Sequence, residues 1–230
     1  MYFYDWTFII IIPAIIFAFY AQAKVSSAYS RYARVANRKH MTGAQAARRI
    51  LDQNGMQNVP IEITQGKLSD HYDPSKRVMR LSPDVYNTAS VAAVSIAAHE
   101  SGHAIQHNIG YAPLSIRNGM VPIVNLASTL SWPLLIIGLI VGANSPSGGI
   151  MFNLGVLFFM GVILFHAVTL PVELNASGRA IEQMQALSII YPDEVAGSKK
   201  VLSAAAMTYI AALAMAIANL IRILILRRDS

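Results

Sequence analysis

Three of the six histidines in this 230-residue chain lie in one short stretch, AAHESGHAIQH, at residues 97–107. His99 and His103 are four residues apart, so on a helix they project from one face and both imidazoles can reach the same ion. Glu100 lies about 100° around the helix from His99, where it can meet a water on that ion without binding the ion tightly. This is the H-E-x-x-H arrangement of zinc peptidases.

The alternative explanation for this stretch is a chance pattern in a buried helix whose histidines satisfy each other. With only six histidines in the chain, a random match is expected in on the order of a few per thousand such chains. Gly102 disfavours a helix by about 1 kcal/mol relative to alanine. We therefore expect a metal site on this helix, and another backbone close to Gly102.

A catalytic zinc site has a third protein ligand and one position open for water. The chain has no cysteine, so the third ligand must be His, Asp or Glu. His107 is eight residues beyond His99, about 12 Å along a straight helix, which is too far to share the ion. Glu173 remains, in LPVELNASGRA directly after an apolar stretch. It is either a solvated charge or the third ligand, and we expect the ligand because carboxylates so close to a bilayer are generally functional.

The composition is that of a membrane protein. Apolar residues make up 54% of the chain and charged residues only 13%, against about 25% charged in typical soluble domains. The net charge of +6 does not indicate nucleic acid, because most basic residues flank apolar runs, as topology signals do. The lack of cysteine excludes a disulfide framework and a thiolate metal site.

Four apolar stretches are each long enough to cross a hydrocarbon core of about 30 Å. The first resembles a signal peptide, because Ala21-Gln22-Ala23 has the form of a cleavage site. It lacks the positive residues that precede such a segment, so we expect a retained anchor. A polar turn at 144–149 joins the second and third stretches as a hairpin. The four stretches are residues 6–23, 121–143, 150–170 and 203–226.

The hydrophilic part between the first two stretches shows local signals of both helix and strand. Thr42 and Gln45 have the form of a capping box for a helix that ends near Asn54. Residues 58–64 alternate like a strand and 77–82 provide a second strand that can pair with it, with a loop between the two. A helix then begins between positions 83 and 90 and carries the histidines to about position 108.

These signals predict a mainly α fold: a multi-pass membrane helical bundle with a zincin-like HExxH helix and a small β-hairpin or sheet in a cytoplasmic segment. The expected segments are an amino-terminal transmembrane helix (1–23), the cytoplasmic HExxH segment (24–120), a transmembrane hairpin (121–170), a cytoplasmic segment with the third ligand (171–202), and a carboxy-terminal transmembrane helix with a basic tail (203–230).

The basic residues set the expected orientation in the cell membrane. Twelve Lys and Arg lie in 24–120 and three in 171–202, and none lies in 1–23 or in the 144–149 turn. The positive-inside bias places both hydrophilic segments, and the active site, in the cytoplasm. Arg227 and Arg228 would then lie outside, against the rule, unless the last stretch lies along the membrane surface. We expect it to span.

The three motifs AAHESGHAIQH, LPVELNASGRA and GKLSDHYDPSKRVMRLSPDVYN together resemble the bacterial membrane family of neutral zinc metallopeptidases, the YugP type. They are more distantly similar to the HtpX and CAAX-processing membrane proteases, whose third ligand is the glutamate of E-x-x-A-D. Glu173 matches that frame, but Ser177 replaces the acid. In those relatives the acid is expected to orient a ligand histidine. Another group must do so here, and the candidates are Asp70, Asp73 and Asn175, with His71 weaker.

Three further residues are candidates for supporting roles. Arg179 and Tyr209 are candidate donors to the oxyanion. His166 lies in the third apolar stretch, seven residues before Glu173. An intramembrane histidine is a functional candidate, and the alternative is a hydrogen bond to a neighbouring helix.

The sequence therefore predicts an integral membrane endopeptidase with one Zn²⁺ per chain, in which zinc polarises the scissile carbonyl and Glu100 is the general base. Peptides or membrane proteins are the expected substrates, membrane lipid surrounds the helices, and the strand at 61–64 or 78–81 offers an edge to an extended substrate. The alternative is a non-catalytic, zinc-stabilised scaffold, which has no need of Glu100. A transporter is disfavoured because the apolar stretches show no paired halves.

Overall fold

The computed structural model describes residues 6–66 and 69–228. These residues form a short 3-10 helix, η1 (Trp6–Ile10), seven α-helices and three short strands. The predicted fold class, mainly α with a small sheet, is confirmed. The chain divides into two compact units. We call residues 22–115 and 171–207 the hydrophilic unit, and the described residues within 6–21, 116–170 and 208–228 the apolar unit.

The hydrophilic unit begins with the end of α1 (Ile12–Tyr32) and with α2 (Gly43–Gln53). The predicted capping box at the start of α2 is confirmed: Thr42 accepts from the Gln45 N–H, and the Gln45 side chain accepts from the Thr42 N–H. Asn54 caps the carboxy-terminal end, and Gly55 follows with a φ of 73°, a left-handed conformation that favours glycine.

A three-stranded sheet lies in the same unit, in the order β1-β3-β2. Its strands are β1 (Ile61–Ile63), β2 (His71–Asp73) and β3 (Val78–Leu81), and β3 pairs in parallel with β1 and antiparallel with β2. The two predicted strands do pair, but the prediction that only a loop separates them is wrong. The polar triplet of β2 is too short to show a strand pattern in the sequence.

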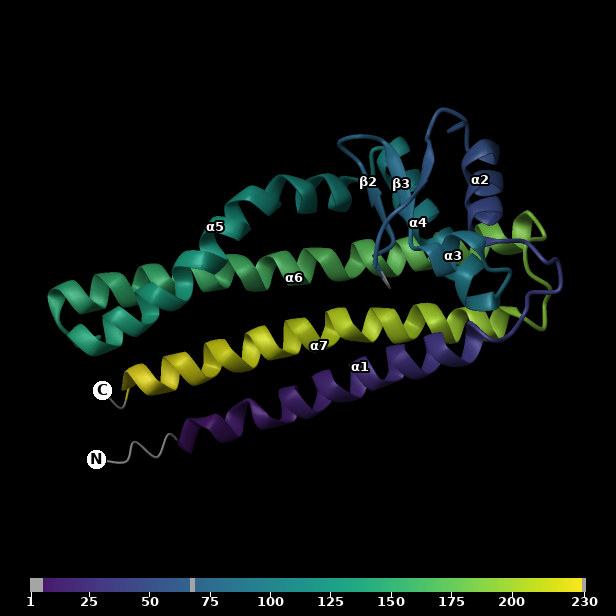
Figure 1. Cartoon of the computed structure of the whole chain (residues 1–230). Helices are drawn as coiled ribbons and strands as arrows, with labels where there is room; N and C mark the ends of the chain where they lie inside the picture. The colour runs from purple at the N-terminus through teal and green to yellow at the C-terminus, as the bar shows by residue number, and fades with distance from the viewer. Residues whose placement is uncertain (1–5, 67–68, 229–230) are drawn as a thin grey trace. The chain divides into compact units, whose positions relative to one another are not determined.

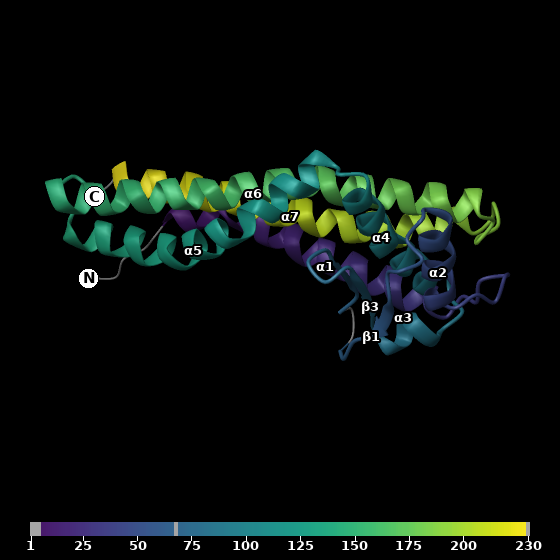
Figure 2. The ribbon, with the colours of Figure 1, turned by 90° about the horizontal axis from the view of Figure 1, so that it is seen from above.

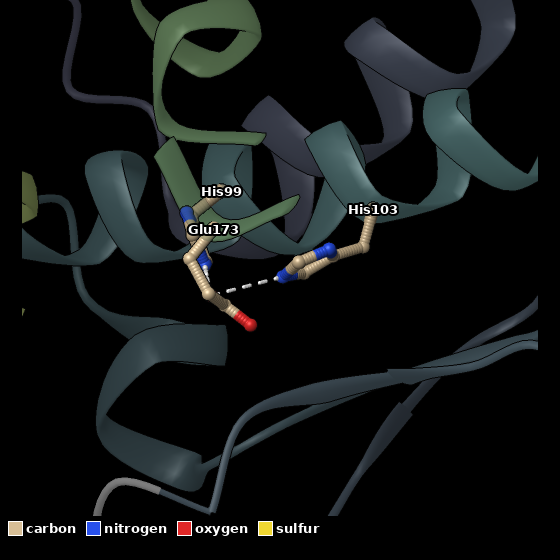
Figure 3. Close-up of side chains that lie close together, drawn as sticks. All are labelled: His99, His103 and Glu173. Carbon is tan, nitrogen blue, oxygen red and sulfur yellow. Dashed lines mark hydrogen bonds and ion pairs between the residues drawn. The ribbon is translucent and has the colours of Figure 1, made fainter. Parts of the chain in front are cut away.

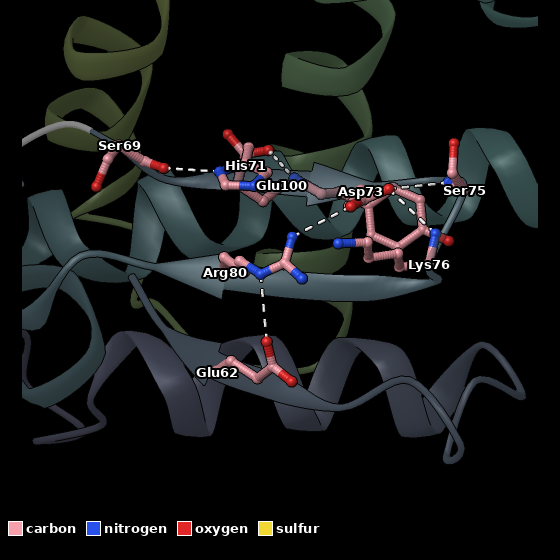
Figure 4. Close-up of polar contacts among 9 residues, drawn as sticks. Glu62, Ser69, His71, Asp73, Ser75, Lys76, Arg80 and Glu100 are labelled. Atoms are coloured by element: carbon pink, nitrogen blue, oxygen red, sulfur yellow. Dashed lines mark hydrogen bonds and ion pairs between the residues drawn. The ribbon is translucent and has the colours of Figure 1, made fainter. Parts of the chain in front are cut away.

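Asp73 and Arg80 hold β2 in place beside β3 (Figure 4). The Asp73 carboxylate accepts hydrogen bonds from the backbone N–H groups of Ser75 and Lys76, which tightens the turn after β2. Arg80 on β3 bridges both neighbours, because it contacts Asp73 at 3.1 Å and Glu62 on β1 at 3.2 Å. These contacts order a strand that has little apolar side chain of its own to bury.

The centre of the hydrophilic unit is α4 (Val91–Asn108), which follows the short α3 (Pro83–Asn87). Ser90 caps its start by accepting from the Ala93 N–H. The predicted end of the histidine helix is confirmed, whereas its first residue, Val91, lies one position beyond the predicted range, with Ser90 as the cap. Figure 1 shows α2, α3 and the strands grouped around α4. The shared core includes Ile50, Leu51, Met79, Leu81 and Val94, all with no exposed surface.

Helix α4 meets α6 (Pro146–Ala186) at Gly102. A Cβ atom at this position would lie 2.5 Å from the carbonyl oxygen of Ala176, closer than any side chain can approach a backbone. The predicted close approach of another backbone to Gly102 is confirmed. This contact brings the HESGH stretch of α4 against the segment of α6 that carries Glu173.

In the apolar unit, α5 (Ala112–Val141) and α6 form the predicted hairpin, and the second half of α5 lies beside α6 (Figure 1 and Figure 2). Glycines make the two helices fit closely. A Cβ at Gly138 would meet the backbone of Phe152, and one at Gly155 would meet Leu135. Small residues at helix contacts of this kind are typical of membrane bundles. Helix α5 contains Pro122 and Pro133, and it bends along its length in Figure 1, as interior prolines cause helices to do.

Among the described residues, three helices are long and apolar enough to cross a membrane: α5, α6 and α7 (Val195–Arg228). They contain the second, third and fourth apolar stretches of the sequence. Helix α1 is not among them, because the first stretch is divided between η1 and the first half of α1, and the second half of α1 is polar, with Lys24 and Arg31. Whether this segment spans stays a prediction.

The arginines near the end of α7 have partners within the apolar unit. The Arg222 guanidinium lies 3.4 Å from the Thr7 hydroxyl and over the Phe8 ring. Arg227 donates to Asn153 at 2.7 Å and lies over the ring of Phe152. If this end of α7 lies outside, as the sequence predicts, these contacts would offset part of the cost that the positive-inside rule assigns to positive charges there.

The predicted orientation is tested by two single cysteines, Ser75→Cys and Ser147→Cys, both at exposed positions. The chain has no natural cysteine, so background labelling is absent. In intact cells a membrane-impermeant maleimide should label position 147 at once and position 75 only after permeabilisation. Labelling of position 75 in intact cells would contradict a cytoplasmic sheet.

Candidate metal centre

His99 and His103 project from one face of α4, with their rings at 82° to each other and the ring centroids 4.8 Å apart. Glu173 of α6 enters between them (Figure 3). Its Oε2 atom lies 3.2 Å from Nε2 of His99 and 3.4 Å from Nε2 of His103. The Glu173 side chain is only 2% exposed. One buried carboxylate oxygen therefore faces both imidazoles at the place where the helices meet.

The three side chains fit a zinc ion. Each offers one ligand atom, and the three atoms lie within 4.8 Å of one another. With bonds of about 2.0–2.1 Å, a tetrahedral zinc holds its ligand atoms about 3.3 Å apart. The two distances from Glu173 to the imidazoles match this separation. Two nitrogens and one carboxylate oxygen form the ligand set of a catalytic zinc site, with one position left for water.

Glu100 lies beside this group, in the turn of α4 between the two histidines, and is buried. One of its carboxylate oxygens accepts a hydrogen bond of 3.0 Å from the backbone N–H of Tyr72 on β2. Burial raises the pKa of the Glu100 carboxyl, although the neighbouring His99 and His103 oppose the rise. A raised pKa suits a general base, because the carboxylate then holds an abstracted proton more readily.

The second ring nitrogen of His99 contacts Ser177. The Ser177 hydroxyl lies 3.1 Å from Nδ1 of His99, at the position that the acid occupies in an E-x-x-A-D motif. The sequence predicts that a residue other than Ser177 orients the histidine rings. This expectation is wrong for His99, because Ser177 itself contacts the second nitrogen of its ring. A hydroxyl is shorter and neutral, but it still reaches the ring because α6 passes so close to α4 at Gly102.

The two aspartates proposed for that role are used inside the sheet region instead. Asp70 accepts hydrogen bonds from the N–H and the hydroxyl of Ser82, and burial raises the pKa of its carboxyl. Asp73 binds Arg80 and closes the turn after β2. Exposed His71 contacts the backbone oxygen of Ser69. Within the described part of the chain, none of these three forms a hydrogen bond with His99 or His103, as their partners are Ser82, Arg80 and the backbone nearby.

The second ring nitrogen of His103 contacts Gln106, which the sequence analysis missed. Nδ1 of His103 lies 3.0 Å from Oε1 of Gln106. The sequence contains the information needed to predict this contact, because Gln106 follows His103 by three residues and such residues are neighbours on a helix. Asn175 and Arg179, which the sequence had singled out, are connected to this glutamine. The Asn175 side-chain oxygen accepts hydrogen bonds from both Gln106 and Arg179.

His107, His166 and Tyr209 are not members of the three-ligand group. Nδ1 of His107 is 2.9 Å from the Tyr72 hydroxyl. His166 and Tyr209 belong to the apolar unit, where the His166 ring lies 6.1 Å from that of Phe165. The functional roles suggested for His166 and Tyr209 stay predictions.

Comparison with known proteins agrees with this centre. The chain matches a family described as "Putative neutral zinc metallopeptidase" over residues 7–228, and it belongs to that family. It is similar to a protein of Bacillus subtilis (strain 168) named "Putative membrane protease YugP", with 42% identity over 211 residues, 92% of each chain. No solved structure matches it. The family resemblance inferred from the three motifs is confirmed.

The ligand assignment is tested by Glu173→Ala and His107→Ala. Loss of one of three ligands weakens zinc binding severely, so Glu173→Ala protein should contain little metal, measured by elemental analysis after purification. His107→Ala is the matched control on the same helix and should keep its zinc. Zinc that follows His107 and ignores Glu173 would contradict the assignment.

The contact of Ser177 with His99 is tested by a pair of substitutions. Removal of a partner from a ligand histidine typically weakens metal binding about 10- to 100-fold. Ser177→Ala should weaken zinc binding by about the lower of these factors, because a hydroxyl is a weaker partner than a carboxylate. Ser177→Asp should bind zinc more tightly than the wild type, in competition with a chromophoric chelator. Equal affinity in all three proteins would show that the contact does not support the metal.

Proposed function

We propose that this protein is an integral membrane zinc endopeptidase whose active site faces the cytoplasm. The observation that carries the proposal is the position of Glu100, a buried carboxylate directly beside the His99, His103 and Glu173 group. Family membership and the three apolar helices support it. The twelve and three basic residues of segments 24–120 and 171–202 support the cytoplasmic side.

His99, His103 and Glu173 would hold the ion, one per chain. When bound, zinc acts as a Lewis acid toward the scissile carbonyl and the attacking water. Glu100 takes the proton from that water as its oxygen attacks the carbonyl carbon, and then gives the proton to the leaving amine as the peptide bond breaks. The Tyr72 N–H holds the Glu100 carboxylate in place and favours its ionised form, which is the form that accepts the proton.

The substrate edge of the sheet would be β2. The sequence suggested 61–64 or 78–81, but β3 is the central strand and has no free edge. Between the two outer strands, β2 is the one whose backbone contacts Glu100. Tyr72 lies opposite Met79 of β3, but its backbone N–H donates to Glu100 and not to β3. This N–H therefore lies on the outer edge of β2. An extended peptide that adds alongside β2 would therefore run past the base.

The alternative is a zinc-stabilised membrane scaffold without catalysis. A structural zinc site is closed by four protein ligands, whereas the group among the described residues has three. A scaffold would also have little use for a carboxylate at this position, because burying one is costly and the single hydrogen bond from the Tyr72 N–H repays only part of the lost hydration. Both observations favour the enzyme, and membrane peptides or proteins are the proposed substrates.

Glu100→Gln tests the proposal. Glutamine is nearly isosteric with glutamate but cannot accept the proton, so peptide hydrolysis should fall at least about 100-fold, the lower end of the range for loss of an acid–base group. The zinc content should not change, since both histidines and Glu173 remain. The measurement is cleavage of a quenched fluorescent peptide library in detergent or proteoliposomes, alongside metal analysis.

Two controls make this experiment decisive. Exposed Glu62→Gln, on β1, removes a carboxylate of the same type away from the base and should cleave at the wild-type rate. Loss of zinc from Glu100→Gln would assign Glu100 as a ligand. Cleavage at the wild-type rate by Glu100→Gln would exclude the peptidase mechanism and favour the scaffold.

A further inference from the structure

A chain of hydrogen bonds runs from the ligand His103 on α4 to Arg179 on α6. Nδ1 of His103 lies 3.0 Å from Oε1 of Gln106, and Nε2 of Gln106 donates to Oδ1 of Asn175 at 3.0 Å. Nε of Arg179 donates to the same Oδ1 at 2.9 Å. Gln106 also donates to the backbone oxygen of Val172 at 2.8 Å and has no exposed surface. We call His103, Gln106, Asn175 and Arg179 the amide relay.

The direction of every hydrogen bond in the amide relay follows from its two fixed ends. A guanidinium can only donate and a backbone carbonyl can only accept. Arg179 therefore requires the oxygen of the Asn175 amide, and Val172 requires the nitrogen of the Gln106 amide. With both hydrogens of that nitrogen used, Gln106 has only its oxygen to offer to His103. His103 must then donate from Nδ1.

The consequence reaches the metal centre. A neutral imidazole that carries its proton on Nδ1 has its free lone pair on Nε2. Nε2 of His103 is the atom that lies 3.4 Å from Glu173, within the three-ligand group. The amide relay thus selects the ring nitrogen that faces the ion. In other zinc sites a carboxylate or a backbone carbonyl usually performs this task.

We propose that Gln106 and Asn175 are positioning residues that fix His103 in its metal-binding tautomer, and that Arg179 orients the relay. This proposal rests on zinc binding in the proposed function. The two ligand histidines then differ. The Ser177 hydroxyl beside His99 can either donate or accept, so it does not select a tautomer, whereas the relay does. Arg179 acts through Asn175 and not on the oxyanion.

The first test measures zinc affinity by chelator competition. Gln106→Leu and Asn175→Leu each remove one link without adding a charge, and each should weaken zinc binding about 10- to 100-fold. Because the links act in series, the double variant should bind zinc about as weakly as the weaker single variant. Gln57→Leu is the control, since Gln57 is an exposed glutamine that donates to a backbone oxygen. Additive losses in the double variant would overturn the relay.

The second test reads the tautomer directly by ¹⁵N NMR of the zinc-loaded protein. In the wild type, His103 should show a protonated Nδ1 in slow exchange with water, and this signal should be lost in Gln106→Leu. Asn175→Asp retains the oxygen that both Gln106 and Arg179 use, so it should restore the signal that Asn175→Leu weakens. These spectra respond to the hydrogen bond itself and not to general packing.

The outcomes separate the two proposals. Wild-type protein that binds no zinc would overturn the proposed function and the amide relay together. Wild-type protein that binds zinc, with unchanged affinity and an unchanged Nδ1–H signal in Gln106→Leu and Asn175→Leu, would overturn the relay alone. Weaker binding with loss of the signal in both leucine variants, and its return in Asn175→Asp, is the result that we expect.

Discussion

The candidate metal centre depends on one backbone contact, the approach of α4 to α6 at Gly102 and Ala176. Gly102 lies between His99 and His103 on α4, and Ala176 lies one turn after Glu173 on α6. Because both helices are rigid over a single turn, this contact sets the distance from the carboxylate to both imidazoles. It also brings Ser177 and Asn175 within reach of α4. A methyl group at position 102 would push α6 away and separate all these pairs at once.

The charges at the site explain why its supporting groups are neutral. Glu100 and Glu173 are both buried, and their two negative charges would balance a bound Zn²⁺ ion. A carboxylate in place of either neutral partner would bind its histidine more strongly, but it would add a third buried negative charge, and burying a charge is costly. Ser177 and Gln106 instead supply hydrogen bonds without charge. The only full charge in the amide relay is that of Arg179, which is partly exposed.

The sequence could predict the parts of the site that follow from spacing along one helix. The four-residue interval of His99 and His103, the capping box of α2 and the close approach at Gly102 are of this kind. Glu173 required only the further argument that a charge beside an apolar stretch is rarely accidental. The polar strand β2 was missed because three residues show no periodicity, and its order comes from Asp73 and Arg80. The contact of Ser177 with His99 could not be predicted from the residue type, because a short, neutral hydroxyl reaches the ring only where α6 passes as close to α4 as it does at Gly102.

Tyr72 connects the parts of the site that no single sequence pattern relates. Its backbone N–H holds Glu100, and its hydroxyl contacts His107, two turns beyond His99 on α4. The strand that would receive an extended substrate is therefore attached to the helix that carries the proposed base and two of the proposed ligands. Because β2 is short and held mainly by polar contacts, a peptide that adds to its edge would compete with Glu100 for the Tyr72 N–H or order the strand further. In either case substrate binding and the position of the proposed base would be coupled through one residue.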